Sequence, residues 1–289
     1  AQRMKNDEMI TLAKFLAISG IILPMLPHKN LIPDINLTPY SIWLATVVVS
    51  GISYLSYLLK RYVFHESGVL VSGIIGGLYS STATISVLAR KSRKASEQEA
   101  NEYVAAMLLA VSMMFLRFMI LILIFSREIF TSIYPYLLIM SVVAAVVAWF
   151  IHSRHRRSKD MTDESEDEDS SNPLEFKVAL IFATLFVVFT VLTHYTLVYA
   201  GTGGLNLLSF VSGLSDITPF ILNLLQNTGS VAVLVVVACS MQAIISNILV
   251  NMFYALFFAG KGSKLRPWIL GGFGTVIGVN LVLLLFFYL

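Results

Sequence analysis

Charged side chains are scarce in this sequence: they make up 13% of its 289 residues, whereas a typical soluble domain carries about 25%. The few charges cluster in short stretches between long apolar runs. This scarcity argues against an ordinary water-exposed surface. The alternative is a soluble protein with a large buried helical core, but such a core does not accommodate so many consecutive apolar residues.

Cysteine and catalytic motifs are also lacking. The one cysteine, Cys239, lies inside an apolar run, which excludes a disulfide framework. The sequence has no His-x-x-Glu-His pairing, no Gly-x-Ser-x-Gly elbow and no phosphate loop, so we expect no enzyme, no metal and no cofactor. The net charge of +3 comes from basic residues that flank apolar runs, which does not indicate a nucleic-acid partner.

Long apolar runs dominate instead, and a run of about 18 or more residues predicts a membrane-spanning helix, with the lipid bilayer as its partner. Two runs of spanning length, Ser67–Ala89 and Gly204–Leu225, are rich in Gly, Ser and Thr. A weaker run, Met9–Leu26, contains Lys14 and Pro24. The strong runs are Ile42–Leu59, Tyr103–Phe125, Phe130–Ile151, Val178–Ala200, Ser230–Ala259 and Trp268–Leu289.

A hydrophilic segment divides the chain. It is basic at first and acidic from Asp160 on, with no apolar residue between Thr162 and Asn172, so we interpret it as a solvated loop; a metal-sensing or docking tail is the alternative. We therefore predict four units: an N-terminal span (1–30), membrane repeat one (31–152), a charged cytoplasmic linker (153–175) and membrane repeat two (176–289).

The two membrane units resemble each other. The stretch that begins at Gly68 aligns without gaps on the stretch that begins at Gly204, so that Gly77 pairs with Gly213 and Thr82 with Thr218. The next run aligns Ser112 with Ser246 and so Arg117 with Asn251. Weak internal repeats of this kind are common in membrane transport proteins.

The positive-inside rule decides between two topologies. If both glycine-rich segments dip in and return, 16 Lys and Arg residues lie inside and two outside; if both segments span, only 10 lie inside. We therefore predict an all-α polytopic protein with two inverted-topology repeats, each of three spans and one re-entrant segment, plus one N-terminal span, in the cytoplasmic (inner) membrane. An ordinary hairpin of short helices, or tilted spans, is the alternative.

Each glycine-rich segment carries candidate binding residues. After Gly73, Gly76 and Gly77, a helix that restarts at Ser80 would have a hydroxyl cap and free N–H groups inside the membrane. In the second segment, Pro219 suits a first helical turn, with Asp216 or Ser215 as the cap. Small-residue packing between helices is the alternative. The candidates are Ser80, Ser81, Thr82, Thr84, Ser215, Asp216 and Thr218.

Arg117 lies in the middle of an apolar run, where a charge is a functional candidate by default. Its repeat counterpart is Asn251, one turn from Asn247, and we include both. Asp216 is the one acidic residue deep in the apolar set, which makes an Arg117–Asp216 pair plausible. The alternative is a purely structural ion pair between the halves.

Three stretches carry a resemblance to a known family. The stretch Gly77–Arg93, with its Gly-Leu-Tyr-Ser-Ser-Thr start, then Asn172–Lys177 and Ser212–Asp216 resemble the C-terminal membrane domain, of unknown function, of MgtC/SapB-family proteins. The resemblance implies a membrane domain that normally follows an MgtC domain, which this sequence lacks, as a fragment or a stand-alone version would. It offers no ligand residues.

These patterns favour a transporter or channel for a small ionic or polar solute. A regulatory or structural membrane subunit that binds a protein partner is the rival hypothesis. Small-residue faces at Gly68–Gly77 and Gly271–Gly278 also predict self-association into a homo-oligomer.

Overall fold

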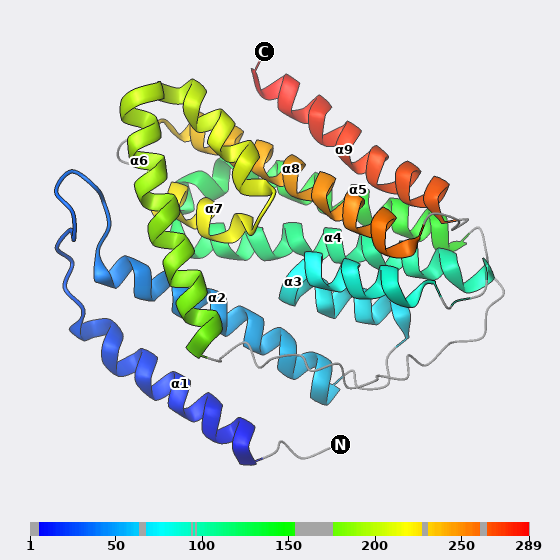
Figure 1. Ribbon diagram of the computed structural model, residues 1–289, viewed down its shortest axis with the longest axis horizontal. Helices are drawn as coiled ribbons and strands as arrows, with labels where there is room; N and C mark the ends of the chain where they lie inside the picture. Colours follow the sequence, from blue (N-terminus) through cyan, green and yellow to red (C-terminus); the bar gives the residue numbers. More distant parts are fainter. Residues whose placement is uncertain are drawn as a thin grey trace.

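The protein is described here from a computed structural model, which covers residues 6–63, 68–93, 95, 97–153, 176–226, 231–260 and 265–288. These residues are almost entirely helical (Figure 1). The elements are α1 (Asn6–Met25), α2 (Pro39–Leu58), the π-helical η1 (Leu59–Val63), α3 (Val69–Lys91), α4 (Glu97–Phe125), α5 (Arg127–Ser153), α6 (Phe176–Gly213), α7 (Ile217–Gln226), α8 (Val233–Ala259) and α9 (Arg266–Tyr288).

Seven of the described helices are long and apolar enough to cross a membrane: α2, α3, α4, α5, α6, α8 and α9. The prediction of an all-helical polytopic membrane protein is confirmed at this level, and the strong apolar runs coincide with helices to within a few residues. Helix α1 is not among the seven, since its described apolar stretch, Ala13–Met25, is shorter. The N-terminal span and the unit boundaries stay predictions, and the linker from residue 154 to 175 lies outside the described residues.

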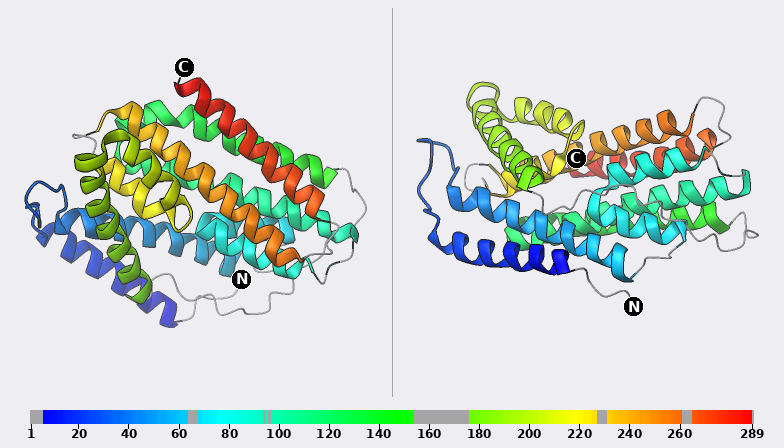
Figure 2. Two further views of the ribbon diagram at one scale, coloured as in Figure 1. Left: turned by 45° about the horizontal axis from the view of Figure 1, so that its top comes forward. Right: turned by 60° about the horizontal axis from the view of Figure 1, so that its bottom comes forward.

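Helices α4, α5 and α8 run lengthwise through the molecule, and α9 lies along its edge (Figures 1 and 2). Helix α4 is largely enclosed by protein, because it packs against α3 and α5. Its residues Val104, Met107 and Leu108 are fully buried, as is Phe115 further along. Burial of α4 by protein rather than lipid fixes the position of Arg117, which this helix carries.

Helix α3 is interrupted at Ser80, whose backbone (φ −158°, ψ 108°) is extended rather than helical. The chain folds back at this residue. A Cβ added to Gly76 would lie 2.5 Å from Oγ1 of Thr84, which is eight residues further on, and positions eight residues apart are distant in a straight helix. The two arms of α3, residues 69–79 and 81–91, lie side by side in Figure 1.

Helix α6 is interrupted at Gly201, which has φ 58° and ψ −153°. This positive φ suits glycine, which has no Cβ to clash with the backbone. The chain turns back at this point (Figure 2) and ends its second arm at Gly213. After a short break, α7 starts at Ile217.

Glycines allow the broken segments to approach the neighbouring helices closely. A Cβ on Gly77 would lie 2.5 Å from the Ala110 Cα of α4, and a Cβ on Gly213 would lie 2.5 Å from the Ser246 Cβ of α8. The first arm of α3 and the second arm of α6 therefore lie in close contact with α4 and α8, respectively.

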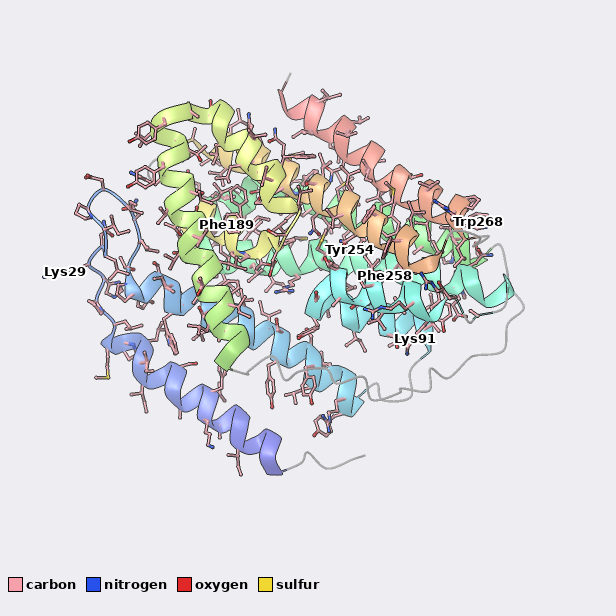
Figure 3. All side chains as sticks on the ribbon, viewed as in Figure 1. Lys29, Lys91, Phe189, Tyr254, Phe258 and Trp268 are labelled. Carbon is pink, nitrogen blue, oxygen red and sulfur yellow. The ribbon has the colours of Figure 1, made fainter. Side chains whose placement is uncertain are left out.

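Three contacts tie distant parts of the chain at opposite ends of the molecule. At one end, Arg93 donates from Nη2 to the main-chain oxygen of Phe257 over 3.1 Å, and the Arg90 guanidinium lies 4.9 Å from the centre of the Phe258 ring. Figure 3 shows Lys91, Phe258 and Trp268 at this end and Lys29 at the other. Near Lys29, Gln226 at the end of α7 donates to the Ser41 oxygen over 3.4 Å.

Candidate functional site

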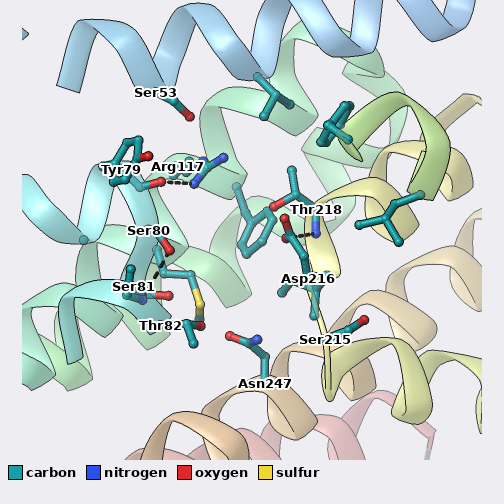
Figure 4. A pocket seen from close by; sticks show the side chains of 18 of the residues that line it. Ser53, Tyr79, Ser80, Ser81, Thr82, Arg117, Ser215, Asp216, Thr218 and Asn247 are labelled. Atoms are coloured by element: carbon teal, nitrogen blue, oxygen red, sulfur yellow. Dashed lines mark hydrogen bonds between the residues drawn. The ribbon is translucent and has the colours of Figure 1, made fainter. Parts of the chain in front are cut away.

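A cavity of about 510 Å³ lies where the interruption of α3 at Ser80 meets the break between α6 and α7 at 214–216, which we call the second interruption (Figure 4). This volume is within the range of small-molecule pockets, roughly 300–1,000 Å³. Residues from α2, α3, α4, α6, α7 and α8 contribute to the wall. The lining residues are Val49, Ser50, Ser53, Gly77, Tyr79, Ser80, Ser81, Thr82, Ala83, Met114, Arg117, Phe118, Ile181, Phe182, Leu185, Leu214, Ser215, Asp216, Ile217, Thr218, Asn247, Val250 and Tyr254.

Ser80 caps the second arm of α3 at the cavity wall. Its hydroxyl oxygen accepts from the main-chain N–H of Ala83 over 3.3 Å, as an N-cap residue does. The first N–H groups of a helix have no partner within the helix and carry a partial positive charge. Since Ser80, Ser81 and Thr82 all line the cavity, this end of the arm makes its wall electropositive.

Arg117 reaches the same interruption from α4. Its Nη1 donates to the main-chain oxygen of Tyr79 over 2.6 Å, at the last residue of the first arm. A helix C-terminus carries partial negative charge, so a guanidinium is stabilised there. The Nε of Arg117 is buried and has no hydrogen-bond partner among the described residues, and the side chain lines the cavity (Figure 4).

Asp216 caps α7 across the cavity from Arg117. Its Oδ1 accepts from the main-chain N–H of Thr218 over 2.9 Å, and Pro219 occupies the first turn that follows. The Asp216 side chain is exposed to the cavity, whereas Thr218 is buried. The cap bond uses one carboxylate oxygen, so the charge of Asp216 stays available on the cavity side.

Two asparagines of α8 support the second interruption. Asn247 donates from Nδ2 to the main-chain oxygen of Gly213 over 3.3 Å, at the end of the second arm of α6. Asn251 in turn donates from Nδ2 to Oδ1 of Asn247 over 3.1 Å. Asn247 lines the cavity, whereas Asn251 is fully buried behind it.

The structure brings eight of the ten residues proposed from sequence to one cavity: Ser80, Ser81, Thr82, Arg117, Ser215, Asp216, Thr218 and Asn247. Thr84 and Asn251 do not line it, because Thr84 packs against Gly76 and Asn251 holds Asn247. Arg117 and Asp216 face the same space without a direct ion pair, since Arg117 binds Tyr79 and Asp216 binds its own turn.

Several lining residues were missed by the sequence analysis. Tyr79 contributes a main-chain oxygen, which no side-chain pattern reveals. Ser50 and Ser53 of α2 are three positions apart and therefore share a helix face, a signal that was present in the sequence. The apolar part of the wall, including Met114, Phe118, Phe182 and Tyr254, has no signature that separates it from lipid-facing residues.

Metal binding has no support within the described part of the chain, where no three His, Cys, Asp or Glu side chains gather as potential ligands. The thiol of Cys239 lies 3.4 Å from Oδ1 of Asn206 as a hydrogen-bond donor. It therefore has a structural partner at membrane depth.

The fold and the cavity define a polytopic helical membrane protein with two interrupted helical segments that meet at one polar site. The chain belongs to the family described as Domain of unknown function (DUF4010), whose family model matches residues 47–259. A relative from Aquifex aeolicus (strain VF5), named "Uncharacterized protein", is 27% identical over 221 residues, which cover 75% of this chain and 94% of the relative. No solved structure matches the chain.

Proposed function

We propose that this protein is a transporter or channel for a small ionic or polar solute, with the cavity as its binding site. The observation that carries the proposal is the meeting of two interruptions, at Ser80 and at 214–216, on one cavity that contains Arg117 and Asp216. Charged groups inside a membrane are costly and typically mark ion or substrate pathways. Broken helices that point their ends at a central site are a recurrent way to bind solutes there.

We also propose that the two halves are related as an inverted repeat, an arrangement common in transporters. Residues 31–152 and 176–289 each supply a helix (α2; the first arm of α6), an interrupted segment (α3; the second arm of α6 with α7) and two further helices (α4 and α5; α8 and α9). The aligned glycines Gly77 and Gly213 pack on α4 and α8, respectively. Similarly, Arg117 donates to Tyr79 at the end of the first arm of α3, and Asn247 donates to Gly213 at the end of the second arm of α6.

The contacts at the two ends support the re-entrant topology. The bond from Arg93 to Phe257 requires the ends of α3 and α8 to lie on one side, as they do only if the second interrupted segment turns back. The bond from Gln226 to Ser41 requires the end of α7 and the start of α2 to share a side, and this then requires the first interrupted segment to turn back as well. Arg90, Arg93 and Arg266 then share that side, which the positive-inside rule makes cytoplasmic. We accordingly propose the cytoplasmic membrane as the location.

A protein-binding subunit is the second candidate from sequence, but no described groove favours it over the cavity. We also propose that the MgtC/SapB resemblance reflects a shared membrane domain, although the cavity argument does not depend on it. Enzymatic activity stays outside the proposal.

Self-association is a separate proposal and needs one correction. Gly73 and Gly77 are occupied by α4 and cannot form a second interface. Gly271, Gly274 and Gly278 have open space beside them, so α9 is the face we propose for a homo-oligomer. A monomer mass in both mild detergent and nanodiscs would remove this proposal.

Liposome flux with a matched pair of variants tests the function. Ser53 is buried and lines the cavity, whereas Leu55 on the same helix is 59% exposed. The panel contains small anions, monovalent cations, Mg²⁺ and neutral α-amino acids. We expect flux of at least one solute, a loss of about tenfold or more (about 1.4 kcal/mol) with Ser53→Trp, and normal flux with Leu55→Trp.

Two outcomes contradict the proposal. One is the absence of flux for every solute with folded, correctly inserted protein. The other is full flux through Ser53→Trp, which would place the pathway elsewhere.

A further inference from the structure

The two halves of the cavity carry opposite charges, and each charged residue aligns with a neutral residue of the other half. The alignment that pairs Gly77 with Gly213 also pairs Ser80 with Asp216, and the alignment of the next helix pairs Arg117 with Asn251. Repeat one therefore combines a neutral cap with a charged side chain on the following helix. Repeat two combines a charged cap with a neutral amide. The cavity therefore has a positive charge on the side of repeat one and a negative charge on the side of repeat two.

From this arrangement we infer that the cavity binds a dipolar solute with an anionic group at one end and a cationic group at the other, such as a neutral α-amino acid. This inference rests on the proposed function, because it names the substrate class of the same site.

The wall from repeat one suits a carboxylate. Arg117 uses Nη1 to hold Tyr79, and its buried Nε has no partner among the described residues. The hydroxyls of Ser81 and Thr82 and the start of the second arm of α3 line the same region. Guanidinium, hydroxyl and helix N-terminal N–H groups are all donors, and an anion is the ligand that satisfies them together.

The wall from repeat two suits an ammonium group. The start of α7 would also attract an anion, but Asp216 already occupies it through the bond to Thr218. The negative charge of Asp216 remains exposed to the cavity, and Asn247 and Ser215 beside it supply further polar groups (Figure 4). This wall therefore repels a second carboxylate and attracts a cation.

The two charges do not neutralise each other directly. Arg117 binds the main-chain oxygen of Tyr79 in α3, Asp216 binds the main-chain N–H of Thr218 in its own turn, and both residues line the cavity. An inorganic cation or anion would satisfy one wall and leave the other charge without a partner of opposite sign. A zwitterion satisfies both, and the apolar residues Met114, Phe118 and Phe182 offer contact for an apolar side chain.

Binding to matched ligands tests the inference. The purified full chain is titrated by calorimetry with alanine, valine, leucine and methionine, and with the carboxylic acid and the amine that lack one charged group of each. We expect at least one amino acid to bind at least tenfold more tightly than both of its singly charged analogues. Equal or weaker binding of all four amino acids would overturn the inference.

Asp216→Asn provides the matched variant, because asparagine keeps an oxygen for the cap to Thr218 but removes the charge. We expect amino-acid affinity to fall about tenfold, to the level of the carboxylic acid, while affinity for the acid itself is unchanged or rises. Glu128→Gln, which removes a carboxylate from the first turn of α5 outside the cavity, is the control and should change neither. An unaltered preference in Asp216→Asn would also overturn the inference.

The two proposals fail in distinguishable ways. If liposomes pass inorganic ions while no amino acid binds, the inference of a dipolar solute is wrong and the transport function stands. If an amino acid binds but no solute of any class crosses the membrane, the transport function is wrong and the ligand class stands.

Discussion

Arg117 of α4 donates a hydrogen bond over 2.6 Å to the main-chain oxygen of Tyr79, the last residue before α3 is interrupted. The interruption frees carbonyl groups that a continuous helix would have bonded internally. A charged donor at that point satisfies one of them and complements the partial negative charge of the helix end. Arg117 therefore has a structural role in addition to its place in the cavity wall.

We expect Arg117→Met to lower the free energy of unfolding by about 1.5–3 kcal/mol, the usual contribution of a hydrogen bond to a charged group. Arg117→Lys should retain part of this stability. Because Arg117 and Asp216 form no direct ion pair, adding Asp216→Leu should not restore the loss. Thermal unfolding in detergent measures all three variants, and recovery of stability in the double variant would argue for a structural ion pair instead.

Gly77, which lies in a close helix contact, and Gly274, which does not, provide a matched test of helix packing. A Cβ at Gly77 would meet the Ala110 backbone at 2.5 Å, whereas Gly274 has nothing within 4 Å. We expect Gly77→Ala to destabilise the protein by about 1–3 kcal/mol through overpacking. Gly274→Ala should be neutral or stabilising by up to about 1 kcal/mol, because alanine is the better helix former. Equal unfolding temperatures for the two variants would contradict this reading of α3 and α4.

The topology predicts which introduced cysteines react from which side. The background is Cys239→Ser, which removes a buried thiol and keeps a group that can donate to Asn206. Lys91→Cys and Arg266→Cys should react with a membrane-impermeant reagent only from the cytoplasmic side, and Lys29→Cys only from outside. Labelling of Arg266→Cys from outside would exclude the re-entrant path in the second half. The topology also predicts a cytoplasmic side for Lys264, but this residue lies outside the described residues.

Tyr136 and Asn280 link α5 to α9 by a hydrogen bond of 2.6 Å from the phenol to Oδ1. The Nδ2 of Asn280 has no partner among the described groups. We expect Tyr136→Phe to cost about 1–3 kcal/mol, because it leaves the buried amide without this bond. Combining it with Asn280→Leu should recover most of the loss. Tyr134→Phe, at a site 41% exposed on the same helix, is the control and should change stability by under about 0.5 kcal/mol.

The sequence was sufficient to predict the spanning helices and the cap residues of the interruptions. Hydropathy located the helices because apolar length is itself the requirement for crossing a bilayer. Ser80 was identifiable as a cap, and Asp216 as one of two candidates with Ser215, because short polar side chains before a helix have a local role, independent of the rest of the fold.

Contacts between distant segments were not predictable in the same way. Thr84 was proposed for the site, but the direction of the turn at Ser80 places it against Gly76. Asn251 was proposed as the counterpart of Arg117, but a shorter side chain at that position bonds to Asn247 instead of reaching the interruption. The contribution of Ser53 depends on how α2 packs beside α3, which periodicity within α2 does not specify.

The bond between Arg117 and Tyr79 joins residues only 38 positions apart, both in the first half of the chain. During synthesis, Tyr79 and Arg117 both leave the ribosome before Asp216 does. The arginine can therefore bind its carbonyl partner without the second half of the chain. The first half of the protein thus contains a partner for its own buried charge when it is inserted. Its electropositive wall consists of residues that are synthesised before those of the opposite wall.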